Sequence, residues 1–458
     1  MLPLQQAREV RDSIIEYIKA TFKFKEKDAS DAFYRFIKSK EDGLFKGPYI
    51  SLKTPFVSAT EEDTKNIPLE IAPNFPPYLH QLQAFRQLSM RNGNKPKPTL
   101  LTTGTGSGKT ECFLYPILDY CYNCNKFNRQ VGVKVIIMYP MNALASDQAK
   151  RLAETIWNDP RLKGKVTAGL FVGEGTNPKD YPRDMGPDHI IENRDAILDT
   201  VPDILLTNFK MLDYGLMRQY FSSLWKGNID TDFKALKFIV LDELHTYDGA
   251  QGTDVANLIR RLKLKLNLPK GTLCPVGTSA TIGNGPDCKK RLCEYASDVF
   301  GEVFHEDNVI EEHRIPVAEY VTETISTLPD IKLIKSCEFG ADDTVASYMK
   351  RLCKVWLKNS TITPVDAGTC LRSMGVVKSL LDILSHGILS LEDVQKKMID
   401  KDANFRRLYL DGGDKVCTIV LENLLALIAY AKRPLNNSGK LIPMLYLQVQ
   451  LWQRELSG

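Results

Sequence analysis

Short apolar runs alternate with longer amphipathic segments through the middle of the chain. The runs are Thr99–Thr102, Val133–Tyr139, Val166–Val172, Ile204–Thr207, Leu236–Leu241 and Leu273–Gly277, and helix-like segments such as Glu111–Tyr122 and Ser146–Trp157 separate several of them. Apolar, β-branched runs at this spacing predict buried parallel strands joined by helices. We therefore expect an α/β fold in which helices cover both faces of a parallel sheet, with ligands at the carboxyl ends of the strands.

Helical periodicity dominates both ends of the chain. Val10, Ile14, Ile18 and Phe22 lie near one helical stripe, and Ser30–Ile37 repeats the pattern. Four further helical segments are expected toward the C-terminus: Asp343–Leu357, Leu371–Ser385, Ser390–Ile399 and Val416–Lys432. We expect a helical accessory region at residues 1–74, the α/β domain at 75–300, and a mainly helical accessory region at 301–458.

Two other segments are expected to be extended. The stretch 43–77 is rich in proline and glycine and is typical of a connection. In the final stretch, Leu445, Leu447, Val449 and Leu451 alternate with polar or aromatic residues, which predicts a strand. No partner strand can follow so close to the last residue. We therefore expect the chain to be cut from a longer polypeptide.

Composition narrows the class of protein. The chain has 458 residues, 43% apolar and 25% charged, as in an ordinary soluble protein. Its most apolar stretch, Ile419–Ala431, contains Glu422 and is shorter than the roughly 20 residues needed to cross a membrane. The charged N-terminus is unlike a signal peptide. We expect no membrane partner and a cytosolic or nuclear protein, the cytoplasm being favoured.

Charge and cysteine content decide little more. The formal net charge is +4, which neither predicts nor excludes nucleic-acid binding. Ten cysteines lie at irregular spacing, and only Cys121 and Cys124 form a CxxC pair, without a second pair at zinc-site spacing. Reduced and mostly buried thiols are expected.

The sequence TGTGSGKT at 103–110 lies between an expected strand and an expected helix. Glycines allow backbone N–H groups to approach phosphates closely, the lysine of such a loop reaches the β- and γ-phosphates, and the final hydroxyl binds Mg²⁺. Thr103 stands where the general pattern has glycine. We expect ATP to bind through Thr103, Gly104, Thr105, Gly106, Ser107, Gly108, Lys109 and Thr110.

A second chemical pattern is the pair of acids Asp242 and Glu243, which follows the apolar run FIVL. Asp242 is expected to hold Mg²⁺ together with Thr110, and Glu243 to orient and deprotonate the attacking water. Lys109 completes the expected catalytic set. A pair of acids that only caps a helix is the alternative, and the nearby phosphate loop makes it the weaker one.

Together with GTSAT at 277–281, these residues resemble superfamily 2 helicases with a DExH box. Asp242–His245 matches the box, and Ser279 and Thr281 match the motif that couples hydrolysis to strand movement. YLHQ at 78–81 is similar to the upstream glutamine motif. The resemblance implies a RecA-like domain that uses ATP and Mg²⁺. It also implies that Gln81 reads the adenine and that His245 lies at the nucleotide.

Two more segments resemble the family's strand-contacting motifs: YPMNALA at 139–145 and LTNFKML at 206–212. Pro140, Asn142, Thr207 and Asn208 are therefore expected to grip the phosphates of a nucleic acid without reading its sequence. The longer sequences around these motifs resemble bacterial phage-defence helicases and large helicase-related repair proteins. His245 differs from the aspartate of RNA-type DEAD-box proteins. DNA is therefore favoured over RNA, and a nuclease or methyltransferase of a defence system is an expected partner.

The second RecA-like domain of such helicases brings a QxxGRxxR motif with arginines that face the nucleotide. No such sequence occurs after residue 283. We therefore expect this chain alone to be nearly inactive and the full-length protein to be a helicase or translocase. An ATP-gated nucleic-acid-binding scaffold that does not turn over, and an RNA helicase, remain the alternatives.

Two weaker patterns have ordinary explanations. His305–Asp307 with Glu311, Glu312 and His313 lacks metal-site spacing and is expected to be a solvated loop. Arg260, Arg261, Lys263 and Lys265 are typical of a solvated helix face, with a phosphate-holding role as the lesser alternative.

Overall fold

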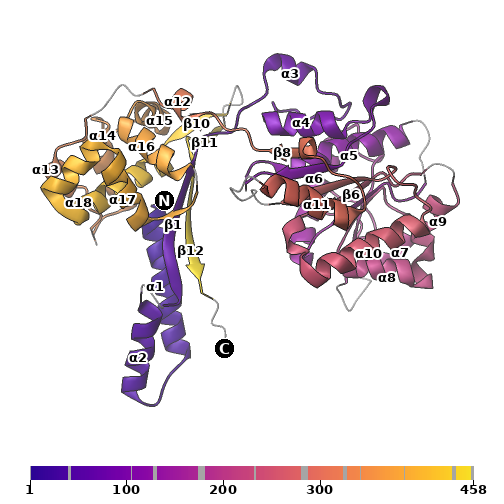
Figure 1. Ribbon diagram of the computed structural model, residues 1–458, viewed down its shortest axis with the longest axis horizontal. Helices are drawn as coiled ribbons and strands as arrows, with labels where there is room; N and C mark the ends of the chain where they lie inside the picture. The colour runs from indigo at the N-terminus through magenta and orange to yellow at the C-terminus, as the bar shows by residue number, and fades with distance from the viewer. Residues whose placement is uncertain are drawn as a thin grey trace. The chain divides into compact units, whose positions relative to one another are not determined.

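The computed structural model describes the chain apart from a few short segments. The described ranges are residues 2–39, 43–104, 106–126, 131–173, 181–231, 234–279, 287–322, 327–340, 342–385, 387–435 and 440–454. They form two compact units (Figure 1). Unit 1 comprises residues 1–55 and 314–458, and unit 2 comprises residues 56–313. The expected boundary near residue 300 lies inside unit 2, and the two terminal regions belong to one unit.

Unit 2 is built on a parallel sheet of seven strands. The strands are β2 (Thr99–Thr102), β3 (Val135–Met138), β4 (Ala168–Phe171), β5 (Ile204–Thr207), β6 (Phe238–Leu241), β7 (Cys274–Ser279) and β8 (Val309–Glu311). Their order is β4-β5-β3-β6-β7-β2-β8, and all the pairings are parallel. Six of the strands coincide with the apolar runs, so the expected fold class is confirmed.

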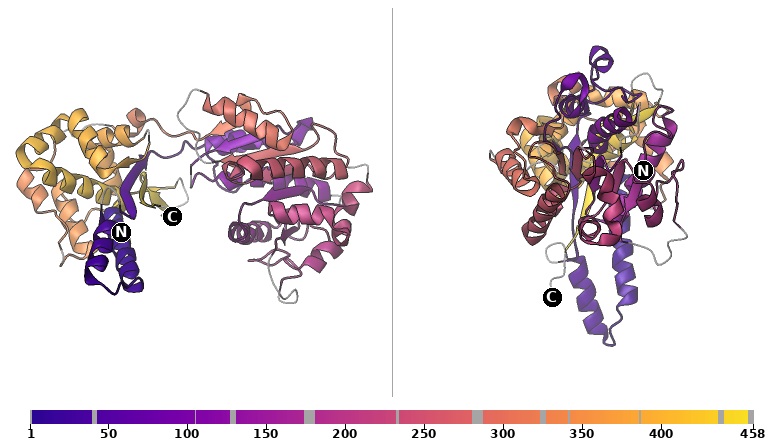
Figure 2. Two further views of the ribbon diagram at one scale, coloured as in Figure 1. Left: turned by 60° about the horizontal axis from the view of Figure 1, so that its bottom comes forward. Right: turned by 90° about the vertical axis from the view of Figure 1, so that its right-hand side faces the viewer.

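Helices cover both faces of this sheet (Figures 1 and 2). One buried cluster joins the sheet to α4 (Leu79–Leu88), α5 (Lys109–Asn125) and α6 (Asn142–Asn158). The other joins it to α7 (Arg194–Asp199), α8 (Phe209–Met217), α9 (Ser222–Ile229), α10 (Gly249–Lys265) and α11 (Cys288–Phe300). Alternate strand residues serve the two clusters, as Ile136 and Ile137 do in β3, because successive side chains of a strand point to opposite faces.

A buried ion pair lies at the amino ends of β3 and β5. Lys134 Nζ is 2.5 Å from Asp203 Oδ1, and both side chains are almost fully buried. The second carboxylate oxygen of Asp203 accepts hydrogen bonds from the Thr167 backbone and from the Asn125 amide. This network fixes the starts of neighbouring strands and the end of α5.

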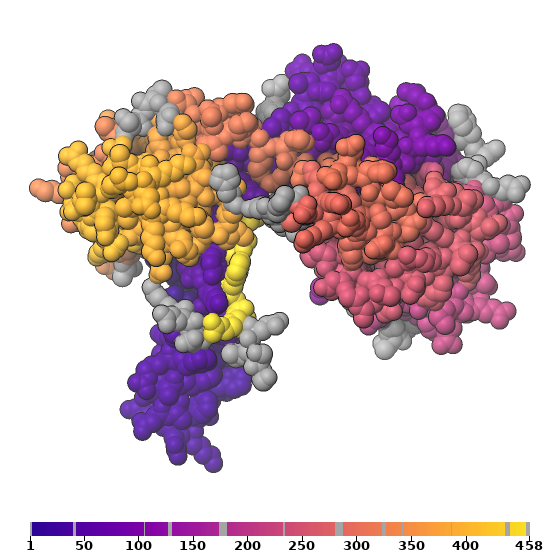
Figure 3. Space-filling view, viewed as in Figure 1, coloured from indigo at the N-terminus to yellow at the C-terminus, as the bar shows by residue number. Residues whose placement is uncertain are grey.

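Unit 1 combines a helical body with a small antiparallel sheet. The helices of the body are α12 (Val317–Tyr320), α13 (Ile331–Lys335), α14 (Val345–Trp356), α15 (Pro364–Arg372), α16 (Gly375–Leu384), α17 (Leu391–Lys401) and α18 (Ala403–Tyr430). The chain begins with α1 (Pro3–Thr21) and α2 (Lys27–Lys38), which lie side by side as a hairpin (Figure 2). In the space-filling view this hairpin is indigo and extends from the helical body of the same unit (Figure 3).

The final strand of the described chain finds its partner far upstream. β12 (Tyr446–Gln453) pairs with β1 (Phe45–Lys53), which also pairs with β9 (Leu389–Ser390), so that the order is β12-β1-β9. A second ribbon joins β10 (Lys432–Pro434) to β11 (Leu441–Pro443). The partner of the final strand therefore precedes it in the chain and does not follow it. The extended stretch that was expected to be a mere connection supplies its neighbour.

Two further findings bear on composition. The ten cysteines are free, and seven of them are buried. Among the described residues, no helix is long and apolar enough to cross a membrane.

Candidate functional site

The phosphate loop begins where the fully buried strand β2 ends and closes at the first turn of α5. Gly106 and Gly108 have φ values of +75° and +74°, a region that disfavours residues with a Cβ. A Cβ on Gly108 would also lie only 2.3 Å from Gln81 Nε2. Two of the expected glycines are therefore required by the backbone path itself.

Side chains brace the loop from inside. The hydroxyls of Thr103 and Ser107, both buried, lie 2.7 Å apart. His80 Nε2 is 2.8 Å from the Ser107 carbonyl oxygen, and Gln81 Nε2 donates to the Gly108 carbonyl oxygen at 3.2 Å. Thr103, the departure from the glycine pattern, thus contributes an internal hydrogen bond. Thr105 lies outside the described residues.

Gln81 is already engaged at both ends of its amide. Its Oε1 accepts a hydrogen bond from the Tyr78 backbone at 2.9 Å, which caps α4, while its Nε2 contacts the phosphate loop. The side chain is 2% exposed. Gln81 therefore couples α4 to the loop in this structure, and its reading of adenine stays a prediction.

Asp242 and Glu243 follow β6, and Thr278 of β7 connects them. The Thr278 hydroxyl donates to Asp242 Oδ1 at 2.5 Å and accepts a hydrogen bond from the Glu243 backbone at 3.0 Å. Burial raises the pKa of Asp242, the charge of Glu243 adds to the rise, and the Thr278 hydrogen bond opposes it. Glu243 has a φ of +50°, an uncommon value for a residue with a side chain. Sequence reasoning did not single out Thr278, although the threonine lies inside the recognised GTSAT segment.

Lys109 joins the loop to these acids. Its Nζ lies 3.5 Å from Glu243 Oε1 and donates to the Ser279 carbonyl oxygen at 3.2 Å. His245 Nδ1 lies 3.3 Å from Glu243 Oε2 and 3.4 Å from the Ser279 hydroxyl. The sheet order explains the cluster, because β7 lies between β6 and β2. Thr110 lies in the first turn of α5, and Thr281 lies outside the described residues.

A carboxylate that sequence reasoning assigned to a solvated loop touches the phosphate loop. Glu312 follows β8, and its Oε2 accepts a hydrogen bond from the Gly104 backbone at 2.9 Å. Glu311 pairs instead with Lys289, and His313 contacts Gln83. The local sequence gave no signal for Glu312, since only the pairing of the three-residue strand β8 with β2 brings it there.

The expected strand-contacting residues gather at the carboxyl ends of β3 and β5, which are neighbours in the sheet. Asn208 Nδ2 donates to Asn142 Oδ1 at 2.7 Å, and Asn208 Oδ1 caps α8 by accepting from the Met211 backbone. Pro140 is partly buried beside them. Thr207 is fully buried and donates to the Phe171 carbonyl oxygen at 2.6 Å. Its contact with a nucleic acid stays a prediction.

The basic side chains of α10 form ion pairs and hydrogen bonds with other residues of the protein. Arg261 pairs with Asp213 at 2.7 Å, and Lys263 pairs with Glu302 at 2.7 Å. Arg260 and Lys265 donate to backbone carbonyls. These contacts agree with the structural explanation better than with a phosphate-holding role.

The residues present fit a nucleotide with Mg²⁺. The Gly104 N–H donates to an anionic oxygen, that of Glu312, so the loop already accommodates negative charge. Lys109 supplies a cation, and the oxygens of Thr110 and Asp242 are ligands of the kind that Mg²⁺ prefers. A parallel sheet with this loop at the carboxyl end of a strand defines the class as a P-loop nucleotide-binding domain.

Comparison with known proteins identifies the domain further. Residues 78–287 match the family model of the DEAD/DEAH box helicases. This part of the chain is a DEAD/DEAH box helicase domain, as its motifs indicated.

Three relatives illustrate the range of similar proteins. The Druantia protein DruE of Escherichia coli (strain UMEA 4076-1) is 25% identical over 83% of this chain and 25% of its own length. The uncharacterized ATP-dependent helicase MJ1574 of Methanocaldococcus jannaschii is 26% identical over 62% of this chain and 38% of its own. The uncharacterized ATP-dependent helicase YprA of Bacillus subtilis is 31% identical over 47% and 24%. The chain thus spans only a quarter to two fifths of each relative.

Proposed function

We propose that this chain is the ATP-binding half of an ATP-dependent DNA helicase or translocase. The observation that supports the proposal most directly is the single cluster of Lys109, Glu243 and Ser279, which unites the phosphate loop, the DExH box and the coupling motif. Each group has the chemistry that ATP hydrolysis needs, and a lysine–glutamate contact of 3.5 Å leaves both side chains near one reacting phosphate.

The roles of the side chains follow from their contacts. Lys109 neutralises the β- and γ-phosphates, and Asp242, held by Thr278, orients the metal site together with Thr110. Mg²⁺, when bound, neutralises charge on the phosphates. Glu243 takes the proton of the attacking water. His245 and Ser279 contact Glu243 and Lys109 and thereby relay the state of the nucleotide to the rest of the domain.

Coupling to nucleic acid uses the neighbouring strand ends. Asn142 is the first residue of α6 and Asn208 is the N-cap of α8, and the N-terminal N–H groups of helices favour phosphate oxygens. Contacts of this kind position a strand without reading its bases. The proposal takes DNA as the substrate, the cytoplasm as the location, and phage defence or DNA repair as the process, with a nuclease or methyltransferase as a partner.

Two substitutions separate binding from turnover. Lys109→Ala should weaken Mg²⁺–ATP binding at least tenfold, because the phosphates lose the cation of the loop. Glu243→Gln should leave the affinity within about threefold and abolish turnover, because the amide keeps the shape but cannot accept the proton. Affinity is measured by calorimetry on this chain, and turnover by phosphate release from the full-length protein.

The outcomes also decide between enzyme and scaffold. Equal losses of ATP affinity in both variants would refute the assigned roles. If Glu243→Gln changed nothing in the full-length protein, because the unmodified protein itself did not turn over, the ATP-gated scaffold would be the correct alternative.

A further inference from the structure

A basic groove lies in unit 1, where the hairpin of α1 and α2 meets β1 and the start of α17. Its volume is about 660 Å³. Four cations line it, Arg8, Arg11, Lys38 and Lys46, against two carboxylates, Asp12 and Glu392. In Figure 3 the indigo hairpin marks this part of the unit, with β12 in yellow beside it.

The cations of the groove are not all neutralised by the protein. Arg11 lies 3.0 Å from Asp12, and Arg8 lies 2.5 Å from Glu422. Lys38 and Lys46 are exposed, and within the described part of the chain neither of them has a carboxylate partner. Lys38 Nζ lies 4.5 Å from the centre of the Tyr34 ring, and a hydrogen bond with Tyr34 raises the pKa of Lys38, as do the nearby charges of Glu16 and Asp12. The groove therefore presents two exposed lysines, and the charge of Lys38 is partly offset by Asp12 and Glu16.

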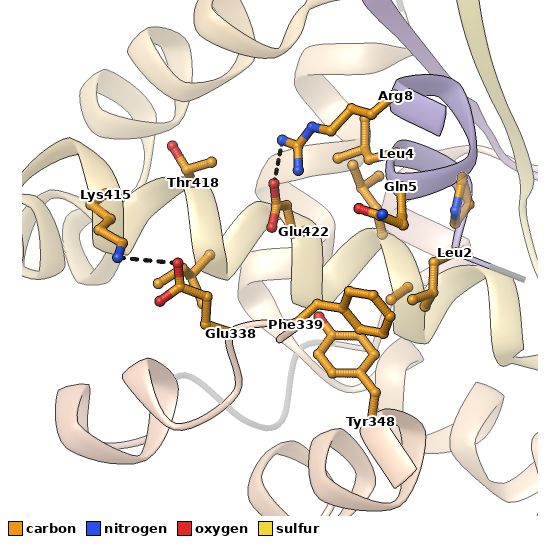
Figure 4. A pocket seen from close by; sticks show the side chains of 14 residues that line it. Leu2, Leu4, Gln5, Arg8, Glu338, Phe339, Tyr348, Lys415, Thr418 and Glu422 are labelled. Carbon is orange, nitrogen blue, oxygen red and sulfur yellow. Dashed lines mark hydrogen bonds and ion pairs between the residues drawn. The ribbon is translucent and has the colours of Figure 1, made fainter. Parts of the chain in front are cut away.

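A neighbouring cavity provides a contrast within the same unit. It has a volume of about 290 Å³ and lies between α1, α14 and α18 (Figure 4). Its charged groups are paired, Arg8 with Glu422 at 2.5 Å and Lys415 with Glu338 at 3.1 Å. This second cavity is balanced in charge and gives no preference for an anion.

Aromatic rings accompany the basic groove. Tyr49 lines the groove, and its ring centre lies 4.4 Å from that of Trp452, which is 48% exposed. Lysines along a groove with an exposed aromatic face beside it are the combination that binds single-stranded nucleic acids, because the cations hold the phosphates and the ring stacks on a base. A simple polyanion would have no use for the ring.

We propose that this groove binds a single-stranded nucleic acid, with Lys38 and Lys46 on the phosphate backbone and the Tyr49–Trp452 pair stacking on a base. The inference rests on the proposed function in that the protein works on nucleic acid. It adds a contact surface in unit 1 that is separate in sequence from the helicase motifs of unit 2.

The test compares charge-reversal variants of the whole chain. Lys38→Glu with Lys46→Glu should weaken binding of fluorescein-labelled oligodeoxythymidine about fivefold to tenfold at low salt and reduce the salt slope by about 1.4, since each single-strand phosphate contact contributes about 0.7. Lys350→Glu with Lys354→Glu, on the exposed face of α14 in the same unit, is the matched control and should change neither. Fluorescence anisotropy over a salt series measures both quantities.

A second variant tests the aromatic element. Trp452→Ala should weaken binding about fivefold with an unchanged salt slope, because it removes stacking and no charge. Lys46→Glu alone, which breaks no contact in the described structure, guards against a folding defect in the double variant.

The possible results separate the two proposals. If the groove variants bind as the α14 control does, while Asn142→Ala with Asn208→Ala weakens binding, the groove proposal is refuted and the proposed function stands. If the unmodified chain binds no oligonucleotide at any salt concentration, both proposals fail.

Discussion

At this site, Glu243 adopts a backbone conformation that residues with a side chain disfavour, and surrounding hydrogen bonds impose it. Glu243 has a φ of +50°, and its N–H is bound by Thr278. Such backbone conformations cost roughly 1–3 kcal/mol and persist when surrounding contacts impose them. The Thr278 hydroxyl satisfies this N–H and also donates to Asp242. One side chain thus places both acids of the DExH box.

The phosphate loop offers a test at the same scale. Gly108→Ala should weaken Mg²⁺–ATP binding at least tenfold, since the new Cβ would lie 2.3 Å from Gln81 Nε2 and must displace that side chain or the loop. Calorimetry on the purified chain measures the effect.

Gly93 provides the matched control for this substitution. It has the same φ of +74°, and a Cβ there would meet nothing within 4 Å. Gly93→Ala should therefore cost about 1 kcal/mol of stability through backbone strain and leave nucleotide affinity unchanged. Equal affinity losses in both variants would contradict the assigned role of the Gly108–Gln81 contact.

At the scale of elements, the strand order does most to build the site. β7 lies between β6 and β2, so Thr278 and Ser279 meet the acids on one side and Lys109 on the other. β3 lies beside β5, so Asn142 meets Asn208. Thr278 and Asp242 are 36 residues apart in sequence, Asn142 and Asn208 are 66 apart, and Lys109 and Ser279 are 170 apart. The carboxyl edge of the sheet brings them together.

The amino edge of the same sheet depends on the buried pair of Lys134 and Asp203. Lys134→Met should destabilise unit 2 by about 3–5 kcal/mol, because it leaves a buried carboxylate without its counter-charge. Denaturant unfolding followed by a probe in unit 2 measures the loss.

Lys226→Met on the exposed surface of α9 is the control and should change stability by less than about 0.5 kcal/mol. A Lys134 variant as stable as this control would show that Asp203 is satisfied by Thr167 and Asn125 alone.

At the scale of the whole molecule, the chain leaves one unit, builds another and returns. Unit 1 is assembled from both ends of the chain, and β1 and β12 pair across it. The helicase domain is thereby inserted in a unit whose first and last segments are hydrogen-bonded to each other. Removal of residues 1–55, which include β1, should therefore expose the edge of β12 that is hydrogen-bonded to β1.

The rate of ATP hydrolysis is a property of the whole chain. The transition state spreads negative charge over the γ-phosphoryl oxygens, and the resemblance implies arginines of a QxxGRxxR motif, which does not occur between residue 284 and residue 458. The 458-residue chain should therefore bind Mg²⁺–ATP yet release phosphate near the background rate, with or without single-stranded DNA.

Phosphate-release assays on the purified chain measure this directly. Robust turnover stimulated by DNA in a monomer would mean that an arginine of residues 284–458 completes the site. Turnover that rises steeply with protein concentration would mean that two chains complete each other's sites.

The sequence by itself determined the α/β sheet, six of its seven strands (β2 to β7), and the phosphate loop and acid pair of the site. Those features are local: buried runs flanked by helical segments, and a glycine loop or acid pair at the end of a run.

The sequence did not predict β1 or β8, because β8 has only three residues and β1 lacks regular alternation. It also began α16 too early, at Leu371, across the break at Ser373 and Met374, and it did not predict α15, which precedes that break. The tertiary structure alone decided that Glu312 touches Gly104, that Thr278 joins Asp242 to Glu243, and that both ends of the chain form one unit. Each of these depends on which distant strands become neighbours, and strand order is set by packing of the whole sheet, which no local pattern encodes.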